Sequence, residues 1–267
     1  MKPAQVSLEK EDEEDFENEK KFRQYLPFMV VKEYLETGQI DRKLWLAEPH
    51  SHEDKPWTIE TRPHNAMEAG TRQVKDADGY FVENAIRLLP GWSLAIAVDQ
   101  EINTPATLRL GGEGHRAILH RCDRLGEQWQ QLQARSQQNF NKQERSLAYL
   151  VTPGVFERKH DNKKSVCQAW AWEWKLARTT NSNQTAGTLV SVATDRAVPI
   201  SCRIQYNGDS IPAPQVFAAP PGSVYYLNQP QQLFQDDLTK KVHIWRQLGY
   251  SELLWIPFPT KIINSPS

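Results

Sequence analysis

The chain has 267 residues, of which 39% are hydrophobic and 10% aromatic, so it is long enough for one large domain or for two of about 100–150 residues with a sizeable core. The formal net charge is −1, but residues 1–20 hold eight acids and three lysines, net −5, which leaves +4 on residues 21–267. This balance excludes a strongly basic nucleic-acid binder and permits a basic groove on the body of the chain.

Two features of the composition bear on the cell compartment. No apolar run reaches the roughly 18 residues of a membrane helix, since the longest, "LLPGWSLAIAV" (88–98), is interrupted by proline, glycine and serine. The start of the chain is charged and lacks the apolar segment of a signal peptide, which predicts a cytoplasmic protein. Cys122, Cys167 and Cys202 show no C-x-x-C spacing, so we expect reduced core residues rather than disulfides or a zinc site.

The first part of the chain combines polar tracts with one helical pattern. The acidic tract that ends at residue 20 is expected to be a solvated or disordered tail. Within residues 19–40, apolar side chains at i, i+3 and i+4 predict a helix with Gly38 as its C-cap. Residues 41–78 are rich in proline, histidine and charge, and we interpret them as a loop.

From Gly79 onward the pattern becomes that of β-strands. Helices are predicted at 123–148 and 231–249. The order lacks a regular βαβα alternation, which predicts an α+β fold with antiparallel sheets and with helices packed on one side. Residues 188–195 and 198–206 are expected to pair with each other. The predicted strands are 80–88, 92–99, 107–110, 115–122, 146–154, 165–177, 188–195, 198–206, 223–227 and 252–258.

Three tryptophans, Trp170, Trp172 and Trp174, alternate within the predicted strand 165–177. The periodicity of a strand places their indoles on one face. Such a face can stack nucleobases in a groove, but large aromatic side chains more often fill a core, and we favour the core.

Three glycines and a glutamate, residues 111–114, separate two predicted strands. This loop lacks the strand-to-helix context of a dinucleotide site and the G-K-[ST] of a triphosphate site, so both are excluded. Two interpretations stay open. The loop is either a tight hairpin turn or a segment whose N–H groups approach a phosphate, with His115 and Arg116 adding donors and charge.

The histidines raise two further possibilities. His50 and His52 form an H-x-H, and His115 and His120 lie five apart, but no H-E-x-x-H or Cys/His set occurs, so no metal site is expected. His64 could act as a general base in RNA cleavage, although a histidine in a polar loop more often serves only as a hydrogen-bonding group.

Several strings in sequence order carry a more specific signal, above all "LGGEG", "TPG" and "PPGSVYY". With their neighbours they resemble Cmr subunit three of type III-B CRISPR effector complexes, a Cas-five group member of the RAMP superfamily. The resemblance covers about residues 20–260. The strings are "LPFMVVKEYLETGQI" (26–40), "TRPHNAM" (61–67), "DGYFVENAIRL" (78–88), "WSLAIAVD" (92–99), "LRLGGEGHRAIL" (108–119), "YLVTPGVF" (149–156), "ATDRAVPI" (193–200), "APPGSVYYL" (219–227) and "LGYSELLWIPF" (248–258).

The resemblance implies two ferredoxin-like (RRM-type) domains, in agreement with an α+β fold. The expected organisation is an acidic tail (1–20), a first domain (21–145) and a second domain (146–267). Family members begin with a strand where this chain has its acidic tail. The alternative that the first domain lacks its opening strand and helix therefore stays open. The family pattern also has a glycine-containing loop directly after the position of "RAVPI", whereas the first glycine in this chain after that string is Gly208.

The resemblance also implies a function. The chain would be a non-catalytic crRNA-binding subunit, without a cofactor or metal, that caps the complex and holds the 5′ handle of the crRNA. Its partners would be the large Cas-ten-type subunit and the Cas-seven-type backbone subunits. The alternatives are a RAMP-type endoribonuclease that processes crRNA and a purely structural scaffold. The residues expected to contact RNA are Arg62, His64, Arg72, Arg109, Gly111, Gly112, Gly114, His115, Arg116, Gly222 and Ser223.

Overall fold

The protein divides into two compact units in the computed structural model. The first, which we call the sheet unit, contains the described residues of Pro27–Trp45 and those from Asp123 onward. The second, which we call the hairpin unit, contains Tyr25, Leu26 and the described residues of Leu46–Cys122. The structure describes residues 25–47, 56–75, 79–110, 115–159, 165–175, 186–200, 203–206, 209–212 and 216–258. The acidic tail, the glycine loop, His50, His52 and Gly208 lie outside these residues.

A four-stranded antiparallel sheet forms the centre of the sheet unit. Its strands are β5 (Ser146–Leu150), β8 (Leu189–Ala193), β13 (Val224–Leu227) and β14 (Leu253–Pro257). They lie side by side in the order β14-β5-β13-β8, and each neighbouring pair is antiparallel. The four predicted strands at these positions are confirmed.

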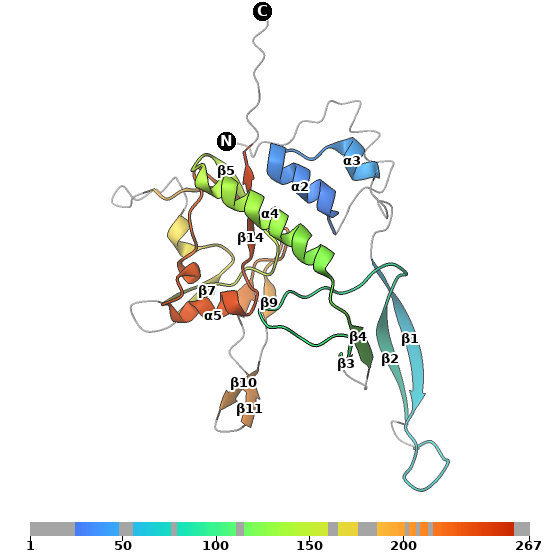
Figure 1. Cartoon of the computed structure of the whole chain (residues 1–267). Coiled ribbons are helices and arrows are strands. Elements are labelled where there is room, and N and C mark those ends of the chain that lie inside the picture. Colours follow the sequence, from blue (N-terminus) through green and yellow to red (C-terminus); the bar gives the residue numbers. More distant parts are fainter. Residues whose placement is uncertain are drawn as a thin grey trace, which may run out of the picture. The chain divides into compact units, whose positions relative to one another are not determined.

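Two helices cover one face of this sheet. α2 (Phe28–Thr37) ends at the predicted cap Gly38, whose φ of 73° is a left-handed conformation that glycine adopts without strain. α4 (Asp123–Asn141) lies across β14, next to α2 (Figure 1). The buried apolar side chains between helices and sheet are Leu35, Leu132, Leu147, Leu254 and Ile256. The α+β class with antiparallel sheets is therefore confirmed, and the predicted division at residue 145 stays a prediction.

The opposite face of the sheet packs on a second core that contains Trp174. Strand alternation sends Ala148 and Leu150 to this face, while Leu147 faces the helices. Trp174 is fully buried, with its ring centroid 5.6 Å from that of Tyr225. The buried members of this core are Ala148, Leu150, Phe156, Ala171, Trp174, Leu189, Ala219, Tyr225, Leu227, Leu233 and Trp255.

The predicted ladder of three tryptophans is wrong. The strand β7 (Ser165–Gln168) ends early, and η1 (Trp172–Trp174) is a 3₁₀ turn. The turn carries Trp174 into the core, where its indole N–H donates to the carbonyl oxygen of Gln231 at 3.0 Å. A buried indole N–H needs such an acceptor. Trp170 and Trp172 are only half-buried, with ring centroids 6.1 Å apart.

Short elements complete the sheet unit. The expected pairing of 188–195 with 198–206 is wrong, because β8 pairs with β13 and the second segment splits into β9 and β10, which pair with β12 and β11. The helix predicted over 231–249 is reduced to 3₁₀ turns and one short helix. The elements are β6 (Phe156–Lys159), β9 (Val198–Ile200), β10 (Arg203–Tyr206), β11 (Asp209–Pro212), β12 (Val216–Ala218), η2 (Phe234–Asp236), η3 (Lys241–His243) and α5 (Ile244–Gln247).

An aspartate side chain favours a turn directly after η2. Asp237 accepts hydrogen bonds from both the backbone N–H and the hydroxyl of Thr239. Such local side-chain bonds compete with the hydrogen bonds of a helix and favour turns.

Two antiparallel hairpins make up most of the hairpin unit. The long hairpin pairs β1 (Trp57–Asn65) with β2 (Tyr80–Leu88), and the short one pairs β3 (Ala106–Arg109) with β4 (Arg116–Leu119). The predicted strands at β2, β3 and β4 are confirmed. The supposed loop 41–78 instead contains β1 and the helix α3 (Arg42–Ala47).

Two further expectations fail in the hairpin unit. The strand predicted at 92–99 is absent, because residues 92–98 pair with no strand among the described residues. Cys122 is exposed and is not a core residue. The side chain of Cys167 and the whole of Cys202 lie outside what the structure describes.

Candidate nucleic-acid interface

One face of the β1–β2 hairpin is charged. Because side chains alternate along a strand, Glu60, Arg62 and His64 of β1 share a face with Glu83 and Arg87 of β2. All of them except Arg87 are half-buried, whereas the opposite, largely apolar face is mostly exposed. The charged face is thus the less exposed side of the hairpin.

The Glu83 carboxylate lies between two histidines that the sequence had singled out. Its Oε2 is 3.1 Å from His64 Nε2, and its Oε1 is 2.8 Å from His115 Nε2. The hydrogen bonds from His115 and then His64 lower the pKa of Glu83. An ionised carboxylate only accepts hydrogen bonds, so both Nε2 atoms carry a proton. We call these three residues the Glu83 clamp.

The Glu83 clamp joins the two hairpins. His64 and Glu83 belong to the long hairpin, while His115 immediately precedes β4 of the short one. The His64 ring also stacks on Phe81, its cross-strand neighbour, with centroids 5.1 Å apart. The position of both imidazole rings is therefore fixed by contacts within the hairpin unit.

Arg62 already has a partner. Its guanidinium lies 3.1 Å from Glu60 Oε2, and Arg87 lies 2.8 Å from the same oxygen. These hydrogen bonds lower the pKa of Glu60, and the bond with Glu60 raises the pKa of Arg62. An RNA phosphate would have to share Arg62 with this carboxylate.

Arg109 and Arg116 are placed differently. They are direct cross-strand neighbours at the end of the short hairpin where residues 110–115 connect its strands, and both are exposed. Alternation puts them on the side opposite to His115. Among the described residues neither guanidinium forms an ion pair, although like charges directly opposite each other in a sheet are destabilising. This pair is the best-placed anion site among the expected RNA contacts.

The other expected RNA contacts belong to other segments or lie outside the described residues. Gly111, Gly112 and Gly114 belong to the glycine loop, which the structure does not describe. Arg72 is exposed in the connection between β1 and β2. Gly222 and Ser223 belong to the sheet unit.

Gly222 and Ser223 serve a turn in the sheet unit. Gly222 has a φ of 88°, which suits glycine, and directly precedes the buried Ser223. The Ser223 hydroxyl donates to the carbonyl oxygen of Pro220 at 2.6 Å and lies 2.8 Å from Thr194 Oγ1. These contacts account for both residues through local structure.

Sequence reasoning missed Glu83 and Glu60. Both are ordinary alternating positions of strands, and only the register of the long hairpin sets Glu83 beside His64. The one available signal was "VENAIRL", in which Glu83 is the single acid of a predicted strand.

A family model described as CRISPR-associated protein (Cas_Cmr3) matches residues 1–258 of the chain. The chain belongs to the Cas_Cmr3 family. The resemblance drawn from the sequence strings is thus confirmed, and the chain is a CRISPR-associated Cmr subunit that belongs to a multi-subunit effector complex. No curated protein matches it.

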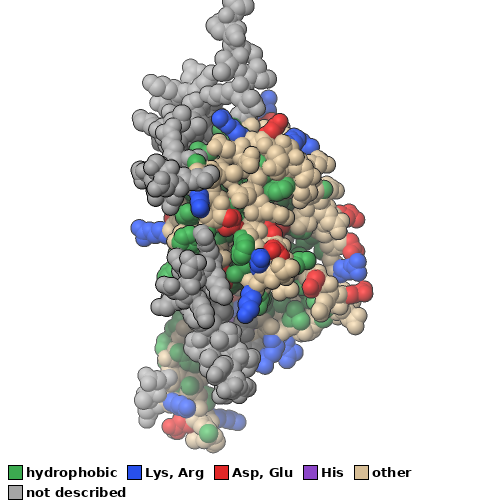
Figure 2. All heavy atoms as spheres, turned by 90° about the vertical axis from the view of Figure 1, so that its left-hand side faces the viewer, with side chains coloured by type: hydrophobic (Ala, Val, Ile, Leu, Met, Phe, Trp, Pro, Cys, Tyr) green, Lys and Arg blue, Asp and Glu red, His purple; other side chains and the backbone are tan. Residues whose placement is uncertain are grey.

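The described residues of this Cas_Cmr3 chain hold no group of three or more His, Cys, Asp or Glu side chains that could bind a metal. No helix among them has the length and apolarity to cross a membrane. On the face shown in Figure 2, basic, acidic and apolar side chains are mixed, in keeping with the small net charge.

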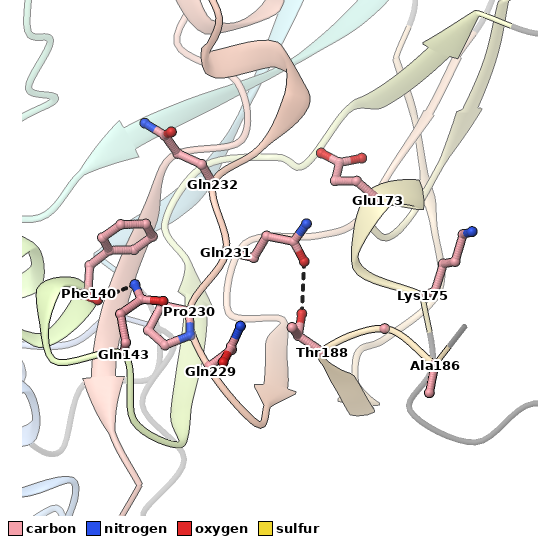
Figure 3. Close-up of a pocket in the computed structure, with 11 residues that line it drawn as sticks. Phe140, Gln143, Glu173, Lys175, Ala186, Thr188, Gln229, Pro230, Gln231 and Gln232 are labelled. Carbon is pink, nitrogen blue, oxygen red and sulfur yellow. Dashed lines mark hydrogen bonds between the residues drawn. The ribbon is translucent and has the colours of Figure 1, made fainter. Parts of the chain in front are cut away.

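A hollow of about 630 Å³ in the sheet unit is lined by several glutamine amides together with the charged Glu173 and Lys175 (Figure 3). The Gln143 amide donates to the carbonyl of Phe140 at 2.9 Å. Gln231 accepts from the hydroxyl of Thr188 at 3.0 Å. Its polar groups are thus partly engaged within the protein. The lining residues are Phe140, Gln143, Glu173, Lys175, Ala186, Gly187, Thr188, Gln229, Pro230, Gln231 and Gln232.

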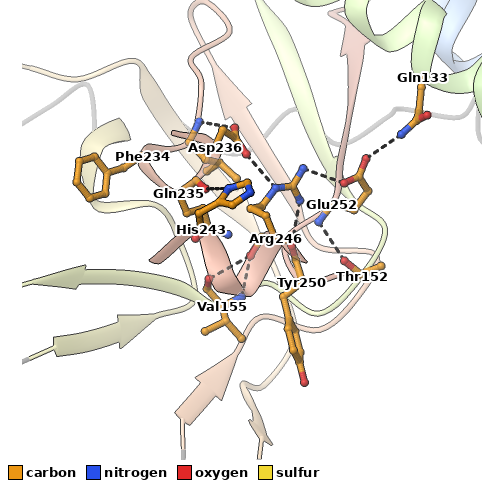
Figure 4. A network of polar contacts seen from close by, with 12 residues as sticks. Gln133, Thr152, Val155, Phe234, Gln235, Asp236, His243, Arg246, Tyr250 and Glu252 are labelled. Carbon is orange, nitrogen blue, oxygen red and sulfur yellow. Dashed lines mark hydrogen bonds and ion pairs between the residues drawn. The ribbon is translucent and has the colours of Figure 1, made fainter. Parts of the chain in front are cut away.

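A charged network around Arg246 is structural in the Cas_Cmr3 fold. Its guanidinium lies 2.9 Å from Asp236, 2.8 Å from Glu252 and 2.9 Å from the carbonyl oxygen of Tyr250 (Figure 4). The network fastens α5 to the turn η2 and to the start of β14. The guanidinium of Arg246 is thus already paired with two carboxylates, which leaves Arg109 and Arg116 as the stronger candidates for an external anion.

Proposed function

We propose that this chain is a non-catalytic crRNA-binding subunit of a type III-B (Cmr) effector complex in the cytoplasm, where it caps one end of the complex and holds the 5′ handle. The observation that carries the proposal is the exposed pair of Arg109 and Arg116, whose charges no described acid balances. Guanidinium groups bind phosphate oxygens bidentately, and two of them side by side suit a nucleic-acid backbone.

The small net charge supports an RNA contact that depends on the assembly. Residues 21–267 carry only +4, so electrostatic attraction by the isolated chain is weak. Single-stranded RNA also requires stacking and base-edge contacts, which neighbouring subunits can add. We propose the large Cas-ten-type subunit and the Cas-seven-type backbone subunits as these neighbours.

The strand order of the sheet unit supports our proposal that the second domain is ferredoxin-like. Its strands, numbered along the chain, lie in the antiparallel order 4-1-3-2, which is the order of the β-α-β-β-α-β fold. The helices differ, since α2 and α4 both precede the sheet in sequence. We infer a ferredoxin-like sheet whose helical layer is supplied by earlier parts of the chain.

The test is RNA crosslinking in the purified complex. Arg109→Ala/Arg116→Ala should reduce crosslinking of this chain to the crRNA 5′ handle at least about tenfold, and should lower the salt slope of single-strand binding by the isolated chain by about 1.4. The matched control is Arg124→Ala/Arg196→Ala, which removes the same charge from exposed positions of the sheet unit. Unchanged crosslinking with weaker assembly would favour the scaffold alternative.

One observation favours an endoribonuclease as a second candidate. The Glu83 clamp brings two imidazoles to one carboxylate, and metal-free RNA cleavage uses histidine as acid and base. Wild-type chain incubated with repeat RNA should then cleave it, and His64→Ala or His115→Ala should abolish cleavage. Intact RNA with the wild type would eliminate this candidate.

A further inference from the structure

The segment Ser93–Val98 has the pattern of a β-strand but no strand beside it. Leu94, Ile96 and Val98 alternate with small residues, as in a strand, and are 72%, 74% and 52% exposed. Among the described residues the backbone of this segment forms no hydrogen bond with other backbone groups. It runs as plain coil between β2 and β3 (Figure 1).

The start of the segment is held in place. Trp92 donates its backbone N–H to the carbonyl of Leu89 at 3.1 Å, and its ring contacts Tyr25 edge-on at 6.2 Å. Tyr25 in turn contacts Trp57 of β1 at 5.9 Å. The segment therefore leaves an anchored turn of the hairpin unit as an extended, exposed length of chain.

We propose that Ser93–Val98 pairs with an extended strand of another subunit of the effector complex. An added strand would satisfy the backbone N–H and C=O groups and cover the alternating apolar side chains at the same time. The inference rests on membership of a multi-subunit complex and does not require that this chain binds RNA.

Charge argues against RNA as the occupant. Residues 88–98 contain no charged side chain, whereas lysine and arginine supply most of the electrostatic attraction between proteins and the phosphate backbone. Size argues against a second copy of this chain, because a stable dimer buries about 20–30 residues on each side and this segment offers six. One such strand is adequate as part of a larger set of contacts within an assembly.

The first measurement is amide hydrogen exchange of residues 93–98 in the isolated chain and in the purified complex. We expect rapid exchange in the isolated chain and slowing of at least about 100-fold in the complex, the protection of a hydrogen-bonded strand. Equally rapid exchange in both would overturn the proposal. Protection already present in the isolated chain would overturn the proposal too. If that protection increased with protein concentration, the segment would pair with a second copy of the chain. If it did not depend on concentration, the partner would lie within the same chain.

The second measurement identifies the occupant. A photoreactive amino acid in place of Ala95 should crosslink to one subunit of the complex, and the crosslink should survive nuclease treatment. Crosslinks to crRNA or to a second copy would refute the assignment. The same crosslink should form in the Arg109→Ala/Arg116→Ala variant, whether or not that variant binds RNA. This result would show that the strand pairing and the proposed RNA contact are independent.

A charge substitution completes the test. Ile96→Asp should reduce recovery of the crosslinked subunit at least about tenfold, since an aspartate cannot be buried in an apolar strand pair. Leu238→Asp is the control, because Leu238 is 78% exposed in the sheet unit. Because both positions are exposed, neither substitution should change the melting temperature of the isolated chain. Equal recovery with both variants would contradict the proposal.

Discussion

At the scale of single residues, Glu83 determines how the hairpin unit presents its histidines. Without the carboxylate, His64 and His115 would have no described polar side-chain partner to hold their Nε2 atoms. With it, both nitrogens are engaged and the long and short hairpins are joined. The clamp therefore positions the hairpin that carries Arg109 and Arg116.

The pH dependence of stability tests this role. The pKa of Glu83 is lowered in the folded protein, so its stabilisation is fully present above its ordinary value of 4.5 and is lost as pH falls through the lower folded value. Glu83→Gln should lower the melting temperature at pH 7 by less than about 4 °C, because the contact is partly exposed.

Thermal melting of Glu83→Gln and of the wild type, followed by circular dichroism from pH 7 to pH 3, measures this difference. The gap between the two proteins should close toward the acid end. A gap of equal size at every pH would show that the glutamine acts through packing and not through the lost charge.

Residue types could be predicted here, but their partners could not. His64, His115, Arg109 and Arg116 stood out because imidazole and guanidinium chemistry is recognisable in the letters. Glu83 did not, because its importance comes from strand register, and register follows from long-range pairing that no local pattern encodes.

At the scale of elements, α4 covers one of the two edges of the central sheet. β14 is an edge strand, and its outward backbone groups at Trp255 are both satisfied by α4. Ser136 Oγ accepts the N–H of Trp255 at 2.8 Å, and Asn139 donates to its carbonyl at 2.9 Å. A covered edge cannot pair with another chain.

Asn139→Ala tests this arrangement. Its side-chain amide also donates to the carbonyl of Leu35 at 2.8 Å, so one buried residue fastens α4 to both α2 and β14. Leaving two buried carbonyls unpaired should reduce the free energy of unfolding by about 2–4 kcal/mol, measured by urea denaturation. Gln130→Ala, exposed on the same helix, should change it by less than about 0.5 kcal/mol. Equal effects would refute the edge-capping role.

Strand prediction succeeded where alternation matched a real partner on the sheet. β5 and β14 alternate between two cores, so their periodicity and their burial agree. Residues 92–99 alternate equally well but have no neighbouring strand in the described chain, and pairing is what makes a strand. The three tryptophans failed for the opposite reason, because burial of Trp174 outweighed the strand pattern.

At the scale of the whole molecule, the two units differ in how they use apolar residues. The sheet unit buries them on both faces of its sheet, whereas the hairpin unit exposes Ile59, Ile86 and Ile96 at 70%, 68% and 74%. Exposed apolar surface of this kind is typical of protein–protein contact sites. A unit of this composition is suited to a place inside an assembly.

Charge is also distributed unevenly over the whole chain, and this leads to the last prediction. Residues 1–20 carry −5 and the remainder +4, so the acidic tract opposes attraction of RNA to the body. Deleting residues 1–20 should tighten binding of a short single-stranded RNA at least about threefold in 50 mM salt. In 1 M salt, where charges are screened beyond about 3 Å, the difference should disappear.

A full-length variant with its eight N-terminal acids changed to amides separates charge from length and should show at least the same gain. If the deletion tightens binding and the amide variant does not, the tract acts by its bulk; if neither does, electrostatic competition between the two parts of the chain is refuted.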